Sequence, residues 1–497
     1  MKSICIPKLE DADDAGTSNS IDCTLILTKG DSAKSQAVAG RSVAGRESFG
    51  VFTLERKILN VQDVSRDEMV HNADMQNLIK ILGLQYEKSY KTVEDLKSLR
   101  YGRLMIMTDP DADGSHFTGL IINFLHHNWP TLLRLHFLEL FVIPVVIVKL
   151  KATKETALNF YSLQKFEEWK TTANLTTYSI EHYKGLGSLT VEKMMAHFKE
   201  LPRYRFVFYH DGDQATDNAI SMAFSPKHTG EQRYWLNSFN DACKLLRSQG
   251  LTEDVYGKET KQISYYDFIK KDMVRYFKVE YERSTPSLID GLKLEQRKVL
   301  FTVLIRKDKD VNVARLALSV AEHTAYYEPG SLMRTIMWMA QDFVGSNNIS
   351  LLIPNGQFGT RHEVFYFAWR FLFLISNNLL FVYQQGGKDA ASPPFISTII
   401  SKLTRLIFHH QDGPLLTHRM DGDQRIEPEF YAPIIPLILV NGTSRIGMSY
   451  NPRDITENLK RMLDDEEPIP MDPWFKGNFV QWRKVIIKRK KTKFLFF

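Results

Sequence analysis

The stretch "GRLMIMTDPDADGSHFTGLIINFLHHNW", from Gly102 to Trp129, decides the fold class. Its apolar run from Leu104 to Met107 predicts a short buried strand, an acidic loop follows, and the apolar spacing after the loop predicts a helix. The stretch "CTLILTKGDSAKSQAVAG", from Cys23 to Gly40, has the same order of strand, polar turn and helix. Two such units favour an α/β domain with a parallel sheet.

Three aspartates, Asp109, Asp111 and Asp113, alternate directly after the predicted strand. Alternate residues of an extended loop share a face, so we expect the three carboxylates to converge. A divalent cation would relieve their mutual repulsion, and carboxylate oxygens suit magnesium. The alternative is a solvated acidic turn at the start of a helix. A calcium loop of the EF-hand kind is excluded, because the helix resumes at once and no glutamate ends the loop.

The length, net charge and cysteine content of the chain limit its possible functions but do not identify one. A length of 497 residues suggests roughly three domains. The net charge of +6 permits a polyanionic partner but does not require one. The cysteines, Cys5, Cys23 and Cys243, form neither a zinc spacing nor a disulfide framework, which fits a reducing compartment.

The segment from Phe365 to Tyr383 approaches the length of about 20 apolar residues that crosses a bilayer. Arg370, Asn377 and Asn378 interrupt it. Polar groups at that depth are costly, so we expect no membrane association.

Further patterns set the expected organisation. The polar, acidic residues 1–20 predict a linker, and residues 201–264 a mixed polar connector. Helical periodicity strengthens from about residue 265 to 345, and "NISLLIPNGQFGTR" predicts a strand and a loop. "FISTIISKLTRLIF", from Phe395 to Phe408, predicts an amphipathic helix with Lys402 and Arg405 facing away.

Three motifs together give a specific resemblance. "KGDSA", "DPDADGSH" and "YKGLGSLT" (Tyr183 to Thr190) resemble the signatures of the TOPRIM domain of eukaryotic type II DNA topoisomerases. Later stretches agree with that family, among them "RSTPSLIDGLKLEQRKVLF", "GGKDAASP" and "MDPWFKG". The resemblance extends from about residue 6 to 478.

The resemblance implies a multidomain α/β and α+β architecture. We expect a parallel-sheet TOPRIM domain over residues 21–200, the connector at 201–264, and a winged-helix DNA-binding domain over 265–410 that carries an insert at 362–385. Part of a tower domain would follow at 411–497. Because the resemblance begins just before TOPRIM, we expect this chain not to bind ATP.

The family also implies roles for individual residues. Its members cut both DNA strands through a tyrosine, with magnesium stabilising charge on the scissile phosphate. Asp109, Asp111 and Asp113 match the metal-binding acidic motif. The positions matching DNA-binding residues are Lys57, His116, Lys184, Arg297, Lys298 and the apolar wedge Ile446. Taken singly, each lysine or arginine would more often be a solvated surface charge.

The pattern breaks at the catalytic positions. Where the family has "SPRY" or "SARY", this chain has Ser392-Pro393-Pro394-Phe395. Phe395 lacks the nucleophilic oxygen, so covalent catalysis there is removed. Pro394 replaces an arginine that would hold phosphate. Lys29 replaces a glutamate that serves as metal ligand and acid–base residue, so we expect a weakened magnesium site.

Other departures agree. Glu55 stands where a DNA-facing arginine belongs, Tyr327-Glu328 replaces a His-His pair, and Arg445 replaces the glycine before Ile446. The insert His362–Gln385 looks foreign to the fold, and we interpret it as a retained intron or mis-annotated exon.

These features predict a nuclear protein that binds double-stranded DNA but does not cleave it. The resemblance implies an isomerase, whereas the residues at the catalytic positions imply that the chain is inactive. One alternative is a heterodimer with a full-length topoisomerase II, in which the relative's tyrosine works with this chain's metal site; a homodimer is also open. The other is a non-functional pseudogene product.

Overall fold

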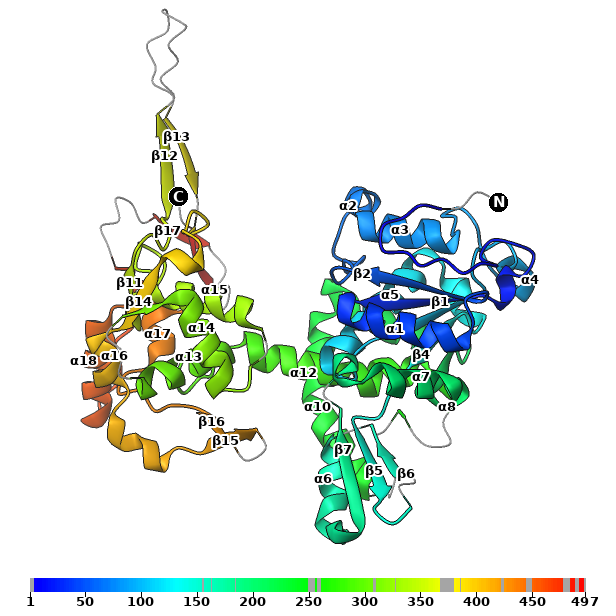
Figure 1. Cartoon of the computed structure of the whole chain (residues 1–497). Helices are drawn as coiled ribbons and strands as arrows, with labels where there is room; N and C mark the ends of the chain where they lie inside the picture. The colour runs from blue at the N-terminus through cyan, green and yellow to red at the C-terminus, as the bar shows by residue number, and fades with distance from the viewer. Residues whose placement is uncertain are drawn as a thin grey trace, which may run out of the picture. The chain divides into compact units, whose positions relative to one another are not determined.

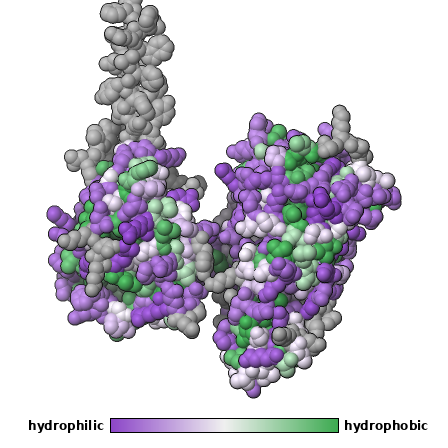
Figure 2. Space-filling model, in the orientation of Figure 1, coloured by the Kyte–Doolittle hydropathy of each residue, from purple (hydrophilic) through white to green (hydrophobic). Residues whose placement is uncertain are grey.

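The computed structural model describes residues 4–153, 156–161, 163–183, 185–248, 255–256, 261–306, 310–326, 328–366, 380–384, 386–421, 424–443, 449–476, 483–487 and 491–495. The chain forms two compact units, Met1–Val279 and Glu280–Phe497, and α12 (Met273–Ser284) contains the division between them. Within the described ranges, no helix has both the length and the apolar character needed to cross a membrane. Hydrophilic residues, interspersed with apolar ones, cover much of each unit on the face shown in Figure 2.

A six-stranded sheet organises the first unit (Figure 1). Its strands, in spatial order, are β2 (Phe49–Leu54), β1 (Thr24–Lys29), β3 (Arg103–Met107), β4 (Leu138–Phe141), β8 (Arg205–Tyr209) and β9 (Gln262–Ser264). The pairing is parallel except between β4 and β8. This confirms the parallel-sheet domain that the sequence predicts.

Helices cover both faces of this sheet. Leu25 and Leu27 of β1 face one apolar core, which contains Phe117 of α5 (Ala112–Asn128). Ile26 faces a second core with residues of α1 (Asp31–Ala44) and α7 (Val191–Lys199). Successive side chains of a strand point to opposite faces, which explains the two cores. The acidic loop follows the last residue of β3 and therefore lies at the carboxyl edge of the parallel strands.

The other helices of the first unit are α2 (Arg66–His71), α3 (Ala73–Leu82), α4 (Val93–Leu96), α6 (Leu163–Thr172), α8 (Leu201–Tyr204), α9 (Gln214–Phe224), α10 (Thr229–Ser248) and α11 (Tyr265–Asp267). A three-stranded antiparallel sheet of β6 (Thr156–Phe160), β5 (Val146–Leu150) and β7 (Tyr178–His182) packs with α6. The expected connector at 201–264 therefore supplies two strands of the main sheet.

The amino-terminal segment is anchored rather than free. The Tyr101 hydroxyl donates to Asp11 Oδ1 at 2.5 Å and accepts from the backbone N–H of Ala12 at 2.9 Å. Glu10 forms a backbone bridge with Val51 of β2. The residues expected to be a linker thus pack against the edge of the first unit.

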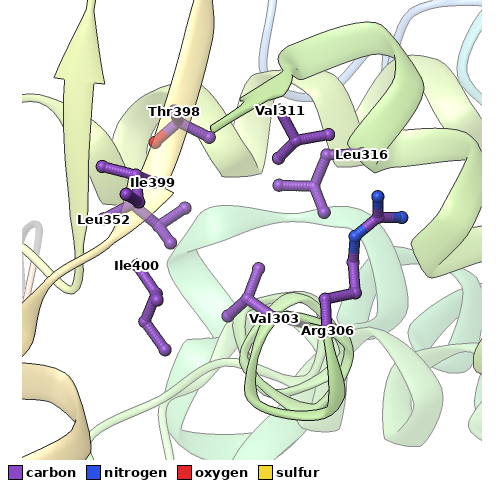
Figure 3. Close-up of a pocket in the computed structure, with 8 residues that line it drawn as sticks. All are labelled: Val303, Arg306, Val311, Leu316, Leu352, Thr398, Ile399 and Ile400. Atoms are coloured by element: carbon purple, nitrogen blue, oxygen red, sulfur yellow. The ribbon is translucent and has the colours of Figure 1, made fainter. Parts of the chain in front are cut away.

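The second unit is built on three helices and a three-stranded sheet. The helices are α13 (Leu294–Ile305), α14 (Val313–His323) and α15 (Pro329–Ala340), and the strands are β10 (Val311–Asn312), β14 (Ser397–Ile400) and β11 (Leu352–Asn355). Val303, Leu316 and Ile400 enclose a void of only about 10 Å³ between helix and sheet (Figure 3). That space holds one water molecule at most, so this is a close-packed core.

The expected helix over Phe395–Phe408 is wrong in its first half. Ser397–Ile400 is strand β14, which pairs with β10 and β11, and only Lys402–Ile407 is helical (α16). Thr398, Ile399 and Ile400 are β-branched and favour a strand. The Ser401 side chain then caps α16 by accepting from the backbone N–H of Leu403.

The described part of the second unit also contains two further helices and three antiparallel strand pairs. The insert contributes β12 (His362–Tyr366) and β13 (Leu380–Gln384), which pair antiparallel. The other pairs are β15 (His418–Asp421) with β16 (Gln424–Pro428) and β17 (Arg483–Ile487) with β18 (Lys491–Leu495), and the helices are α17 (Leu437–Asn441) and α18 (Pro452–Leu463).

Candidate nucleic-acid cleavage site

The acidic loop after β3 is held by backbone amides. Asp111 is the N-cap of α5, and its Oδ1 accepts from the backbone N–H of Gly114 at 2.7 Å. Asp109 Oδ1 accepts from the backbone N–H of Leu186 at 2.6 Å. Two motifs that lie 77 residues apart are therefore in direct contact.

Glycines allow this close approach. A Cβ at Gly185 would lie 2.7 Å from Asp109 Oδ1, closer than carbon and oxygen can pack. A Cβ at Gly187 would lie 3.8 Å from the Cβ of Ser32, an ordinary contact. The structure thus gathers all three motifs, around Ser32, Asp109 and Gly185, at one edge of the sheet, as the resemblance implies.

The three aspartates do not converge as expected. The helix already begins at Ala112, so Asp113 lies in its first turn and the alternation of an extended loop ends before it. Asp113 Oδ1 lies 2.5 Å from Lys57 Nζ, which is also 3.3 Å from His116 Nδ1. Among the described residues, no group of three or more His, Cys, Asp or Glu is placed to hold a metal ion.

The electrostatics of the loop favour a cation. Burial raises the pKa of Asp111, and the carboxylates of Asp109 and Asp113 raise it further. The N–H of Gly114 and the charge of Lys29 act in the opposite direction. Magnesium is commonly held by one or two carboxylates together with substrate phosphate. Asp109 and Asp111 suit that role. The ammonium group of Lys29, in contrast, supplies positive charge that a metal ion would otherwise supply.

Lys57 and His116 meet beside an aromatic ring that the sequence did not indicate. His116 stacks on Tyr276 with ring centroids 3.8 Å apart, and Lys57 Nζ lies 5.0 Å from the centre of the same ring. Lys57 is therefore paired with Asp113 and flanked by Tyr276, and its predicted contact with DNA phosphate stays a prediction.

A small cavity of about 270 Å³ lies beside the acidic loop. Ser115 Oγ donates to Asp272 Oδ2 at 2.6 Å, and Arg275 lies 3.6 Å from the other oxygen of Asp272. No local sequence pattern points to this group, because 157 residues separate Ser115 from Asp272.

Phe395, at the position of the family's tyrosine, is 84% exposed. It ends the short 3₁₀ turn Pro393–Phe395, where its backbone N–H donates to Ser392 O at 2.9 Å. The carbonyl of Pro394 accepts from Asn312 Nδ2 at 2.5 Å, which ties the turn to the start of α14. The ring is presented to solvent but carries no oxygen.

Arg297 and Lys298, which the resemblance assigns to DNA contact, are paired with carboxylates inside the second unit. The Arg297 guanidinium donates to Asp290 at 2.8 and 3.1 Å, and the Lys298 ammonium lies 2.8 Å from Glu427. Arg297 is 4% exposed and Lys298 6%. Both charges are neutralised inside the second unit, and their contact with DNA phosphate stays a prediction.

Four of the sequence-based positions lie outside the described residues, namely Lys184, Tyr327, Arg445 and Ile446. Glu55, at an expected arginine position, pairs with Lys8 at 2.9 Å. The Glu55 carboxylate thus takes part in an ion pair within the first unit.

Comparison with known proteins supports the grouping of motifs. The Toprim domain matches residues 24–143, the C-terminal associated domain of TOPRIM matches 141–281, and the A subunit of DNA gyrase/topoisomerase IV matches 283–373 and 381–493. DNA topoisomerase 2 of Bombyx mori is 51% identical over 488 residues, which is 95% of this chain and 30% of that protein. The human 2-alpha form is 48% identical over 483 residues, again 95% of this chain and 30% of the relative.

A solved structure agrees. The DNA-binding, cleavage and re-ligation domain of Plasmodium falciparum topoisomerase II matches with a TM-score of 0.73 and 39% identity, covering 99% of this chain and 63% of that one. The chain spans about 30% of the length of these curated relatives. It belongs to the eukaryotic type II DNA topoisomerase family and corresponds to the Toprim part and the gyrase/topoisomerase IV-like part of its members.

Proposed function

We propose that this chain binds duplex DNA and does not cleave it covalently. The observation that carries the proposal is Phe395, whose exposed ring occupies the tyrosine position without an attacking oxygen. A phosphotyrosine bond needs that oxygen, and no neighbouring group can replace it without being placed to within about 1 Å.

Binding rests on the arrangement of the first unit. Its acidic loop, glycine motif and Lys57–His116 pair lie at one edge of the parallel sheet. Magnesium bound by Asp109 and Asp111 would neutralise phosphate charge there. Lys29 opposes that cation, so we propose that magnesium binds about 10–100-fold more weakly than it would beside a glutamate. The family resemblance favours a nuclear location.

The test uses the full chain, supercoiled plasmid, magnesium and a denaturant that traps covalent adducts. We expect DNA binding that weakens steeply with salt and no adduct. The matched variant combines Phe395→Tyr with Pro394→Arg and Lys29→Glu, and it is expected to restore a trapped adduct. An adduct with the unchanged chain would overturn the proposal, and failure to bind DNA at low salt would favour a non-functional product.

A second candidate is one half of a heterodimer. It is favoured by the survival of Asp109 and Asp111 at the sheet edge, although this chain's own nucleophile is lost. Paired with a tyrosine-bearing relative, the chain would support single-strand breaks and no double-strand breaks. Co-purification with a tagged relative, followed by trapping, distinguishes nicked from linear plasmid. Removal of the nicks by Asp109→Asn in this chain alone would assign them to its site.

A further inference from the structure

We propose that a cavity in the second unit, lined by neither the acidic loop nor Phe395, binds a small planar aromatic ligand that carries one anionic group. The cavity has a volume of about 600 Å³ and is lined from α13, α16, the 3₁₀ turn His410–Leu415 and the hairpin of β15 and β16. This volume lies in the range of pockets that enclose small molecules.

The floor of the cavity is aromatic and apolar. Phe408 and Tyr431 are 4% and 7% exposed, and their rings meet edge to face with centroids 5.4 Å apart. Phe301 and Leu304 of α13 also line the cavity. Aromatic side chains in this arrangement offer faces and edges on which a planar ring packs.

Cationic groups also line the cavity. Arg405 comes from α16 and Arg425 from β16, and both are exposed. Within the part of the chain that the structure describes, neither guanidinium forms an ion pair with a carboxylate of the protein. Asp412 supplies one opposing charge to the lining. Guanidinium groups bind carboxylates and phosphates in a planar, two-point geometry, so an anion is the expected partner.

Three imidazoles line the cavity, those of His409, His410 and His418, and two of them form hydrogen bonds with the backbone. His418 Nδ1 donates to the carbonyl of Ile426 at 2.6 Å, which leaves Nε2 of the neutral ring as an acceptor. His409 Nδ1 accepts from the backbone N–H of Gln411 at 3.4 Å, so its Nε2 carries the proton and donates. The aromatic floor and the two guanidiniums together define an aromatic acid as the ligand class.

The probe is 2-naphthoate, and naphthalene-2-carboxamide is its neutral counterpart of the same shape. Isothermal titration of the full chain is expected to show saturable binding of naphthoate, with the amide about tenfold weaker or more. Arg405→Gln and Arg425→Gln are each expected to weaken naphthoate about tenfold and to leave the amide unchanged. Arg453→Gln, an exposed arginine of α18 that does not line the cavity, is the control and should change neither.

Equal binding of the two probes, or unchanged naphthoate affinity in both arginine variants, would overturn the proposal. So would the absence of saturable binding. A duplex oligonucleotide added in excess is expected not to displace naphthoate, because a duplex cannot enter a cavity of this size. Displacement that Arg405→Gln abolishes would instead assign the two arginines to DNA phosphate.

Discussion

Arg297 and Asp290 form an ion pair whose side chains are 5% and 0% exposed. Asp290 Oδ2 also accepts from the backbone N–H of Tyr431 at 3.0 Å. This carboxylate therefore joins the start of α13 to a loop that lies 141 residues further along the chain.

Removing one partner of this pair should be costly. Asp290→Ala leaves the buried Arg297 without a counter-charge, and we expect a loss of about 3–5 kcal/mol in the free energy of unfolding. Urea denaturation measures it. The double change Asp290→Leu with Arg297→Met is the control and should lose far less, since it removes both charges. A single-variant loss below about 1 kcal/mol would contradict the burial argument.

The same double variant tests whether Arg297 contacts DNA. A phosphate contact contributes close to one unit to the slope of log affinity against log salt. Because Arg297 is enclosed by Asp290 and the carbonyl of Leu292, we expect the slope to stay unchanged. A slope lower by about one unit, measured on the folded double variant, would return Arg297 to the DNA interface.

Lys29 should limit magnesium binding. Lys29→Glu replaces a cation near Asp111 by a further ligand, and we expect magnesium affinity to rise about 10–100-fold, measured by manganese electron paramagnetic resonance with magnesium competition. Lys80→Glu makes the same charge change at an exposed position on α3 and is the control. Equal gains in the two variants would mean that net charge, and not the site, sets the affinity.

Gly185 should resist substitution more than Gly187. The added Cβ of Gly185→Ala would lie 2.7 Å from Asp109 Oδ1, so the acidic loop must shift, at an expected cost of about 1–3 kcal/mol. Gly187→Ala places its Cβ at an ordinary 3.8 Å from Ser32 and serves as the matched control. Thermal unfolding of both variants checks the difference, and equal stability would rule out the close contact.

Acid should destabilise the first unit through His197. Burial lowers the pKa of this imidazole from 6.5 to about 4. The unfolded chain binds the proton more readily, so the stabilisation is complete above pH 6.5 and is lost as the pH falls towards 4. We expect His197→Leu to flatten the stability profile over this range by on the order of 2 kcal/mol. An unchanged profile would show that other groups govern the acid response.

Local patterns explain what could be predicted. Buried strands followed by polar turns identified the parallel sheet, and the resemblance to the TOPRIM signatures placed Asp109 and Gly185 at one site. The spacing of apolar residues did not distinguish a strand from a helix in Ser397–Ile400. Cross-strand pairing with β11 decides the conformation there.

The burial of charged residues could not be predicted, for a different reason. A lysine or arginine in a sequence is expected at the surface. The partner that buries Lys298 is Glu427, 129 positions away, and no local pattern reveals such a distant counter-charge.

The pairing of Lys298 with Glu427 and of Asp290 with the loop at Tyr431 has a consequence for synthesis. Domains emerge from the ribosome at about 5–20 residues per second and fold as units. A nascent chain that ends before residue 427 holds Lys298 without the carboxylate of Glu427, and the insert at 362–385 lengthens the time before that carboxylate emerges. Packing of α13 against β16 must therefore await the emergence of that strand, and until then the side of α13 that β16 covers stays accessible to chaperones.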